Sequence, residues 1–110
     1  MVTAIPIISV SIQQLKTEYD ANQIAADNKY KGQILQVTGS RVDNISRGFG
    51  GKPYVSLGTG APFEFWSATC HFRDEGQVLE LQRGQIVTIM ARNTGMSVGT
   101  VGFEDCELVK

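Results

Sequence analysis

The sequence predicts a mainly β protein, a small closed barrel with one N-terminal helix, from three observations. The first is a long stretch, residues 31–45, in which apolar and polar residues nearly alternate, as they do in a half-buried strand. The second is Gly39 inside that stretch, because a glycine within a strand pattern usually marks a bulge or a sharp bend. The third is a series of shorter strand-like runs behind it. A long bent strand followed by four shorter ones is typical of the five-stranded oligonucleotide/oligosaccharide-binding (OB) barrel.

Length and composition limit the possible functions. The 110 residues suit an extended arm over residues 1–10 and a single OB-fold domain over residues 11–110. A hydrophobic fraction of 42% supports a core, and 19% charged residues argue against disorder. Ten basic and eleven acidic residues give a net charge of −1, so any binding of nucleic acid must use a local patch. No stretch has the roughly 18 consecutive apolar residues of a transmembrane helix, and the apolar N-terminus lacks the basic segment of a signal peptide.

Residues 11–28 form the predicted helix. Ser11 is a suitable N-cap, and Gln14 three residues later completes a capping box. One helical stripe carries Ile12, Leu15, Tyr19, Asn22 and Ala26. We expect this stripe to cover one open end of the barrel. Asn22 is polar on a buried stripe and needs hydrogen bonds there, so it either caps backbone groups at the barrel end or contacts a ligand.

Four further strands are expected after the glycine-rich hairpin loop of residues 46–52. They cover residues 53–58, 63–72, 85–92 and 98–109, with at most a turn or two of helix in residues 73–83 and a hairpin in residues 93–97. Strand alternation places Cys70 on the inward face together with Trp66, Ala68 and Phe72. In the last strand Cys106 is out of phase with Val101 and Phe103, so a bulge near Glu104 and Asp105 is needed if all of them face the core.

A set of landmarks runs through nearly the whole chain, from about residue 11 to residue 109. They are Tyr19-x-x-Asn22, Ala26-Asp27-x-Lys29-Tyr30-Lys31-Gly32, Val37-Thr38-Gly39, Pro53-Tyr54-Val55-Ser56-Leu57-Gly58, Cys70-x-Phe72, Leu81-x-x-Gly84-Gln85-x-Val87 and Asp105-Cys106. In order and spacing this set resembles the bacterial tRNA-anti-like family. The resemblance implies an OB fold, for which we take Tyr19, Asn22 and Gly39 as structural residues. Many members of the family are lipoproteins or membrane-anchored proteins, which implies an extracytoplasmic location, in the periplasm or at the cell surface, with the signal or anchor absent from this chain. Nucleic-acid binding is attached to the family by analogy of fold.

Catalytic and metal chemistry find little support in the sequence. Cys70 and the single His71 are neighbours on one strand, so their side chains point to opposite faces and cannot converge on a metal. No Ser-His-Asp or Cys-His arrangement can be proposed with this histidine. We therefore predict a protein without catalytic activity, metal or cofactor. Cys70 and Cys106 form either a disulfide or two buried thiols, and we predict the disulfide because both face inward on strands that are neighbours in an OB barrel.

The most suggestive cluster for binding lies between residues 29 and 54. Basic side chains alternate there with aromatic ones: Lys29, Tyr30, Lys31, Arg41, Arg47, Phe49, Lys52 and Tyr54. OB barrels bind single strands in this manner, with bases stacked on rings and cations along the phosphates. The candidate binding residues are Arg41, Arg47, Phe49, Lys52 and Tyr54, with Phe65 on the outer face of the next strand. The alternative is that these charges only keep the strands soluble and the rings pack locally.

Two functions therefore stay open. One is a non-enzymatic OB-fold module that binds single-stranded nucleic acid, or another extended polyanion, through this hairpin and the two strands next to it. The other is an envelope or surface-anchored scaffold that acts through protein–protein contacts. The apolar segment of residues 1–10 is then a candidate contact region.

Overall fold

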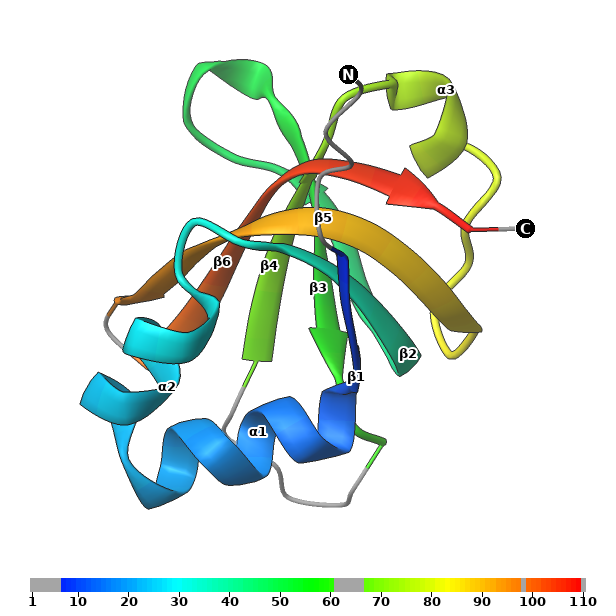
Figure 1. Cartoon of the computed structure of the whole chain (residues 1–110). Coiled ribbons are helices and arrows are strands. Elements are labelled where there is room, and N and C mark those ends of the chain that lie inside the picture. Colours follow the sequence, from blue (N-terminus) through cyan, green and yellow to red (C-terminus); the bar gives the residue numbers. More distant parts are fainter. Residues whose placement is uncertain (1–6, 61–66, 98, 110) are drawn as a thin grey trace, which may run out of the picture.

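The computed structural model describes residues 7–60, 67–97 and 99–109, and within them the strands form one closed sheet. The strands are β1 (Ile7–Ser11), β2 (Ile34–Arg47), β3 (Pro53–Gly58), β4 (Ser67–Phe72), β5 (Ile86–Ser97) and β6 (Thr100–Leu108). Their order is β1-β2-β3-β4-β6-β5, and pairing of β2 with β5 closes the barrel (Figure 1). The expected five-stranded OB barrel is confirmed, with β1 as an additional strand.

The long strand β2 bends at Gly39, as the sequence predicts. Gly39 has a φ of 73°, and the register of β2 against β5 shifts between Val37 and Ser40. A Cβ atom on Gly39 would meet nothing within 4 Å, so the position requires the backbone conformation of glycine rather than its small size. The bend lets the first half of β2 pair with β5 and the second half with β3.

The segment expected as an extended arm contributes a strand. Residues 7–11 run parallel to the start of β2, with Ile7 opposite Ile34 and Ser11 opposite Thr38. Residues 1–6 lie outside the described part of the chain. The first helix begins directly after this strand, at Ile12.

The expected single helix is two helices, α1 (Ile12–Ala21) and α2 (Gln23–Tyr30). Asn22 separates them with extended backbone angles, and its side chain accepts a hydrogen bond of 3.0 Å from the Ala25 N–H. The expected hydrogen bond from Asn22 to the backbone is therefore present. Its expected position on the buried stripe is wrong, because Asn22 is exposed. An amide that caps a new helix competes with continuation of the old one.

Helices α1 and α2 cover the lower end of the barrel in Figure 1. Ser11 caps α1, since its Oγ accepts a 3.0 Å hydrogen bond from the Gln14 N–H. The remaining members of the predicted stripe are buried: Ile12, Leu15, Tyr19 and Ala26. The short helix α3 (Glu75–Val78) lies at the opposite, upper end in the same view.

A buried polar cluster fastens these helices to β5. The Asn93 side-chain amide donates to the Tyr19 hydroxyl at 3.1 Å, and that hydroxyl donates to Asp27 Oδ1 at 2.9 Å. Burial raises the pKa of Tyr19, so it remains a neutral donor.

The prediction of a hairpin over residues 93–97 is wrong. Asn93 is fully buried, and residues 93–97 continue β5, with a register shift at Gly95.

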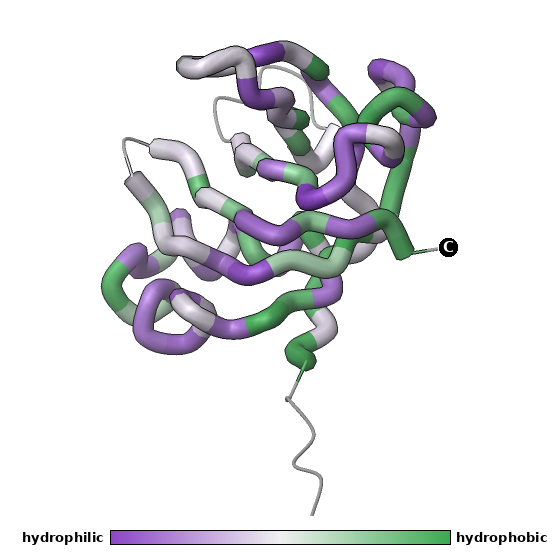
Figure 2. The backbone as a smooth tube through the Cα atoms, turned by 90° about the horizontal axis from the view of Figure 1, so that it is seen from above, coloured by the Kyte–Doolittle hydropathy of each residue, from purple (hydrophilic) through white to green (hydrophobic). Residues whose placement is uncertain are grey.

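The barrel interior is filled by alternate side chains of the strands, and the alternation of hydrophobic and hydrophilic residues is visible along the chain in Figure 2. Buried strand residues include Leu35, Val37, Val42, Val55, Leu57, Ala68, Cys70, Val87, Ile89, Ala91, Val101, Phe103 and Cys106. The bulge expected near Glu104 and Asp105 is confirmed, because Asp105 has a φ of 54° and Cys106 is buried behind it. Trp66 lies outside the described residues.

Candidate functional site

The structure separates the residues that the sequence grouped into one binding hairpin. Arg41 pairs with Gly58, at the far end of β3 from the hairpin loop. Its Nε donates to Asp43 Oδ1 at 2.7 Å, and its Nη1 donates to the Gly60 carbonyl at 3.4 Å. Arg41 is thus remote from the other candidates and already paired with a carboxylate.

Arg47 connects the hairpin to α3. Its guanidinium donates to the Gly51 carbonyl at 2.8 Å and to Glu75 Oε1 at 2.5 Å. Both side chains line a cavity of about 290 Å³ with apolar neighbours such as Ile45 and Leu79. Arg47 therefore faces the end of the barrel that α3 covers.

Tyr54 has the strongest features of a binding residue. It pairs with Ser46, while its inward neighbour Val55 is fully buried, so the Tyr54 ring lies on the outer face of β3. There it lies beside the His71 ring of β4, with ring centroids 6.5 Å apart and planes at 50°. Gly48 lies against the same ring, since a Cβ atom on that residue would be in van der Waals contact with Tyr54 Cδ1, at 3.5 Å.

The remaining candidates add little to this pair. Lys52 is exposed in the hairpin loop. The side chain of Phe49 and all of Phe65 lie outside the described part of the structure. Tyr30, which the sequence placed in the aromatic cluster, is 1% exposed, and its hydroxyl donates to Glu18 in the helical cover of the barrel.

Ion pairs neutralise most of the basic side chains that the structure describes. The pairs are Lys16–Asp20, Lys29–Glu18, Arg41–Asp43, Arg47–Glu75, Arg73–Glu107 and Arg92–Asp105. Hydrogen bonds from Lys29 and Tyr30 lower the pKa of Glu18, so this carboxylate holds its charge. A polyanion that binds to these basic side chains must displace their carboxylate partners. Exposed ion pairs contribute only about 0–1 kcal/mol, so the free energy lost on displacement is small.

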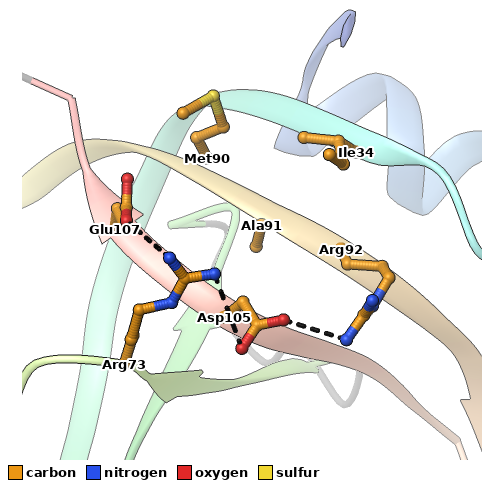
Figure 3. A pocket seen from close by; sticks show the side chains of 7 residues that line it. All are labelled: Ile34, Arg73, Met90, Ala91, Arg92, Asp105 and Glu107. Carbon is orange, nitrogen blue, oxygen red and sulfur yellow. Dashed lines mark hydrogen bonds and ion pairs between the residues drawn. The ribbon is translucent and has the colours of Figure 1, made fainter. Parts of the chain in front are cut away.

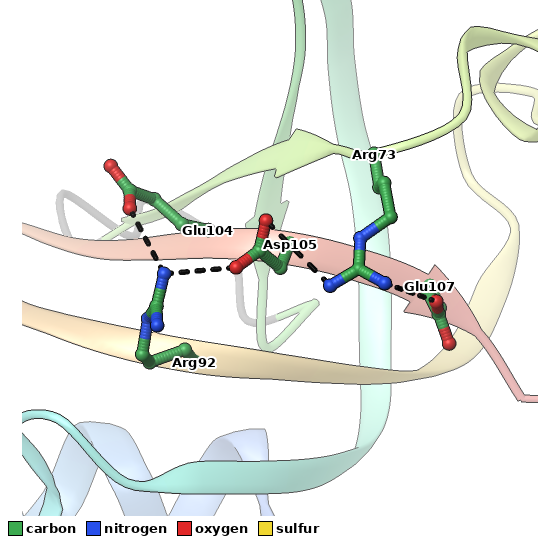
Figure 4. Close-up of polar contacts among 5 residues, drawn as sticks. All are labelled: Arg73, Arg92, Glu104, Asp105 and Glu107. Atoms are coloured by element: carbon green, nitrogen blue, oxygen red, sulfur yellow. Dashed lines mark hydrogen bonds and ion pairs between the residues drawn. The ribbon is translucent and has the colours of Figure 1, made fainter.

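A second arrangement, which the sequence did not predict, lies on β5, β6 and the residue after β4. Asp105 Oδ2 accepts a 2.9 Å hydrogen bond from Arg92 Nη2, and Asp105 Oδ1 lies 3.9 Å from Arg73 Nη2 (Figure 4). Arg73 Nη1 lies 3.6 Å from Glu107 Oε1, and Arg92 also lies 3.7 Å from Glu104. We call Arg73, Arg92, Asp105 and Glu107 the charged ladder.

The charged ladder forms one side of a cavity of about 280 Å³. Figure 3 shows Ile34 and Met90 on the other side, with Ala91 between them and the ladder. One signal for this site could be found in the sequence, the bulge expected near Asp105. The sequence pattern could not show that Arg73 and Arg92 meet at that bulge, because Arg73 follows β4 and Arg92 belongs to β5.

Cys70 and Cys106 are fully buried and carry free thiols. They lie on neighbouring parallel strands, β4 and β6, where Cys70 is opposite Phe103 and Phe72 is opposite Cys106. Burial raises the pKa of the Cys70 thiol, as does its hydrogen bond with Cys106. The predicted disulfide stays a prediction.

The described residues hold no cluster of three or more His, Cys, Asp or Glu side chains arranged for a metal ion. Among them there is also no helix long and apolar enough to cross a membrane.

The closed barrel defines an OB-like module. The sequence matches the family described as tRNA_anti-like over residues 3–107, so the chain belongs to the tRNA-anti-like family. It is also similar to a crystal structure from Klebsiella pneumoniae, that of a "putative nucleic acid-binding lipoprotein". The sequences are 20% identical, the TM-score is 0.73, and the match covers 94% of this chain and 92% of the other, which supports the fold. A search of curated proteins finds no match.

The residues that carry the family resemblance serve the fold. Tyr19 and Asp27 belong to the buried polar cluster, Tyr30 is bonded to Glu18, and Gly39 makes the bend in β2. Family membership therefore does not by itself identify a ligand, and the surface must be argued separately.

Proposed function

We propose that this protein is a non-enzymatic OB-fold module that binds single-stranded nucleic acid across the outer face of β3 and β4. The observation that carries the proposal is the pair of Tyr54 and His71, two neighbouring rings on the outside of an otherwise polar pair of strands. Bases stack on such rings without need for a particular sequence. Lys52 in the adjacent loop is the nearest of the predicted cations to this pair in sequence.

The comparison with solved structures supports nucleic-acid binding and, with it, a proposal for the location of the protein. The similar protein from Klebsiella pneumoniae is described as a "putative nucleic acid-binding lipoprotein". We propose an extracytoplasmic location for this chain as well. A neutral protein without a global positive field is expected to bind weakly and with strong dependence on salt.

Tyr54→Ala tests the proposed stacking. The probe is a labelled oligothymidylate of about 12 nucleotides, within the range that one OB fold occupies. Binding is measured by fluorescence anisotropy at several salt concentrations. We expect the substitution to weaken binding by about 1–3 kcal/mol, which is roughly five- to 150-fold.

Tyr54→Phe keeps the ring and serves as the matched control, because it should bind within about twofold of the wild type if stacking dominates. Ile24→Ala, an exposed residue of α2 at the covered end of the barrel, controls for general effects of substitution. Absence of any binding at low salt would rule out this function.

A second candidate function, a scaffold that acts through protein contacts, is favoured by exposed apolar side chains next to α3 and at the start of β5. Leu79 is 80% exposed and Ile86 is 63% exposed. Ile86 and Val109 line a shallow cavity of about 370 Å³ beside β5. If the oligothymidylate does not bind, this surface is the next to test, by substituting Leu79 and Ile86 with Ser and measuring self-association by sedimentation.

A further inference from the structure

The charged ladder lies next to the proposed stacking surface, on the same side of β4. His71 is exposed on β4, and Arg73 follows the end of that strand directly, with a 64% exposed side chain whose ion pairs with Asp105 and Glu107 place it against β6. Residues two apart in a strand are separated by about 6.5–7 Å. A strand stacked on Tyr54 and His71 therefore passes close to Arg73, which is two residues beyond His71.

Arg73 is only loosely held by its carboxylate partners. Its two ion pairs, at 3.6 and 3.9 Å, exceed hydrogen-bond length, and its side chain is 64% exposed. Arg92 is held more firmly by Asp105, at 2.9 Å. Asp105 thus lies between both guanidiniums and is the carboxylate that keeps them together (Figure 4).

A phosphate group can replace Asp105 as the partner of these arginines. Arg forms bidentate, charge-assisted hydrogen bonds with phosphate, and the exposed ion pairs that would be lost are weak. The opposite side of the cavity, Ile34 and Met90, offers an apolar surface to a base or sugar (Figure 3). The cavity volume of about 280 Å³ is close to the lower limit of small-molecule sites.

We propose that Arg73 and Arg92 bind phosphates of the single strand that stacks on Tyr54 and His71, and that Asp105 occupies both guanidiniums in the free protein and yields them on binding. This inference rests on the proposed function and extends its surface from β3 and β4 to β5 and β6. It assigns Asp105 the role of a competing internal anion, which weakens binding and makes it selective for ligands with closely spaced negative charges.

Asp105→Asn tests the competition directly. Asn tolerates the positive φ of this position better than most residues, so the bulge is retained. We expect the variant to bind the labelled oligothymidylate about two- to fivefold more tightly at low salt, the gain that loss of one exposed ion pair permits. Asp20→Asn is the matched control. It removes the same charge from the pair with Lys16 on α1, at the other end of the barrel, and should not produce this gain.

Arg73→Ala tests the phosphate contact. It should weaken binding and reduce the slope of log affinity against log salt by about 0.7, the value for one phosphate of a single strand. Inorganic polyphosphate, which has no bases, should also bind less well to Arg73→Ala but equally well to Tyr54→Ala. If Asp105→Asn does not fold, which circular dichroism would reveal, Glu107→Gln replaces it with the same expected direction.

The outcomes separate this inference from the proposed function. If Tyr54→Ala weakens binding while Asp105→Asn matches Asp20→Asn and Arg73→Ala keeps the wild-type salt slope, the ladder is not part of the site and only the inference fails. If neither the wild type nor Asp105→Asn binds the oligothymidylate at low salt, both fail.

Discussion

Leu15→Ala lowers the free energy of unfolding by about 2–5 kcal/mol. Leu15 is 0% exposed, and α1, which contacts β1 and β2, covers the lower end of the barrel (Figure 1). Truncation to alanine removes apolar area from the core and leaves a cavity, because Ile12 and Tyr19 are fixed on the same helix face and cannot close it.

Urea unfolding, followed by circular dichroism and by fluorescence, measures this loss as a lower midpoint at an unchanged slope. Ile24→Ala is the control, because Ile24 is 76% exposed on α2 and should change stability by less than about 0.5 kcal/mol. A midpoint for Leu15→Ala equal to that of the wild type would mean that α1 does not contribute to the folded core.

The strands could be predicted because their side chains alternate under one constraint, the closed interior. In β3, Val55 and Leu57 are buried and Tyr54 and Ser56 are not, as the pattern requires. The bulge at Asp105 was predictable for the same reason, since Cys106 could reach the core only if one residue were inserted. Periodicity fails where a polar residue is stabilised by a partner that lies elsewhere in the sequence.

Asn93 illustrates that failure. Asn-Thr-Gly is a typical turn sequence, yet Asn93 is fully buried because its amide is hydrogen-bonded to Tyr19, 74 residues earlier. For Asn22 the error was the opposite one: the helical pattern predicted a buried residue, but Asn22 is exposed. Its side chain accepts a local capping hydrogen bond from the Ala25 N–H, and this bond begins a new helix.

The binding surface was predicted incompletely because charge in a sequence window does not reveal ion pairs across the fold. Arg47 appeared free within its hairpin, whereas its partner Glu75 lies 28 residues away on α3. The ladder was missed because Arg73 and Arg92 are far apart in sequence and come together only when β5 and β6 pair around Asp105. Tyr54 is the one predicted binding residue that the structure describes on the outer face beside another ring.

We expect oxidation of the protein in an extracytoplasmic compartment to join Cys70 to Cys106. The two cysteines lie on neighbouring strands, both fully buried, with their thiols in hydrogen-bond contact. Each thiol loses a proton, and an acceptor disulfide, such as that of a periplasmic oxidant, takes up the two electrons and is reduced to two thiols. Because burial raises the pKa of the Cys70 thiol and the thiolate is the reacting form, we expect the bond to form during folding rather than in the native barrel.

The disulfide should stabilise the oxidised protein by roughly 3–4 kcal/mol relative to the reduced protein, from the chain-entropy value for a loop between positions 70 and 106. Thiol titration of protein made in an oxidising compartment and unfolded without reductant counts the free thiols. Urea unfolding with and without reductant then measures the gain, and Cys106→Ala, which cannot form the bond, should show no effect of reductant. Two free thiols in the unreduced wild type would contradict the disulfide and remove the main support in this chain for an extracytoplasmic location, since free buried cysteines behave as small apolar residues in any compartment.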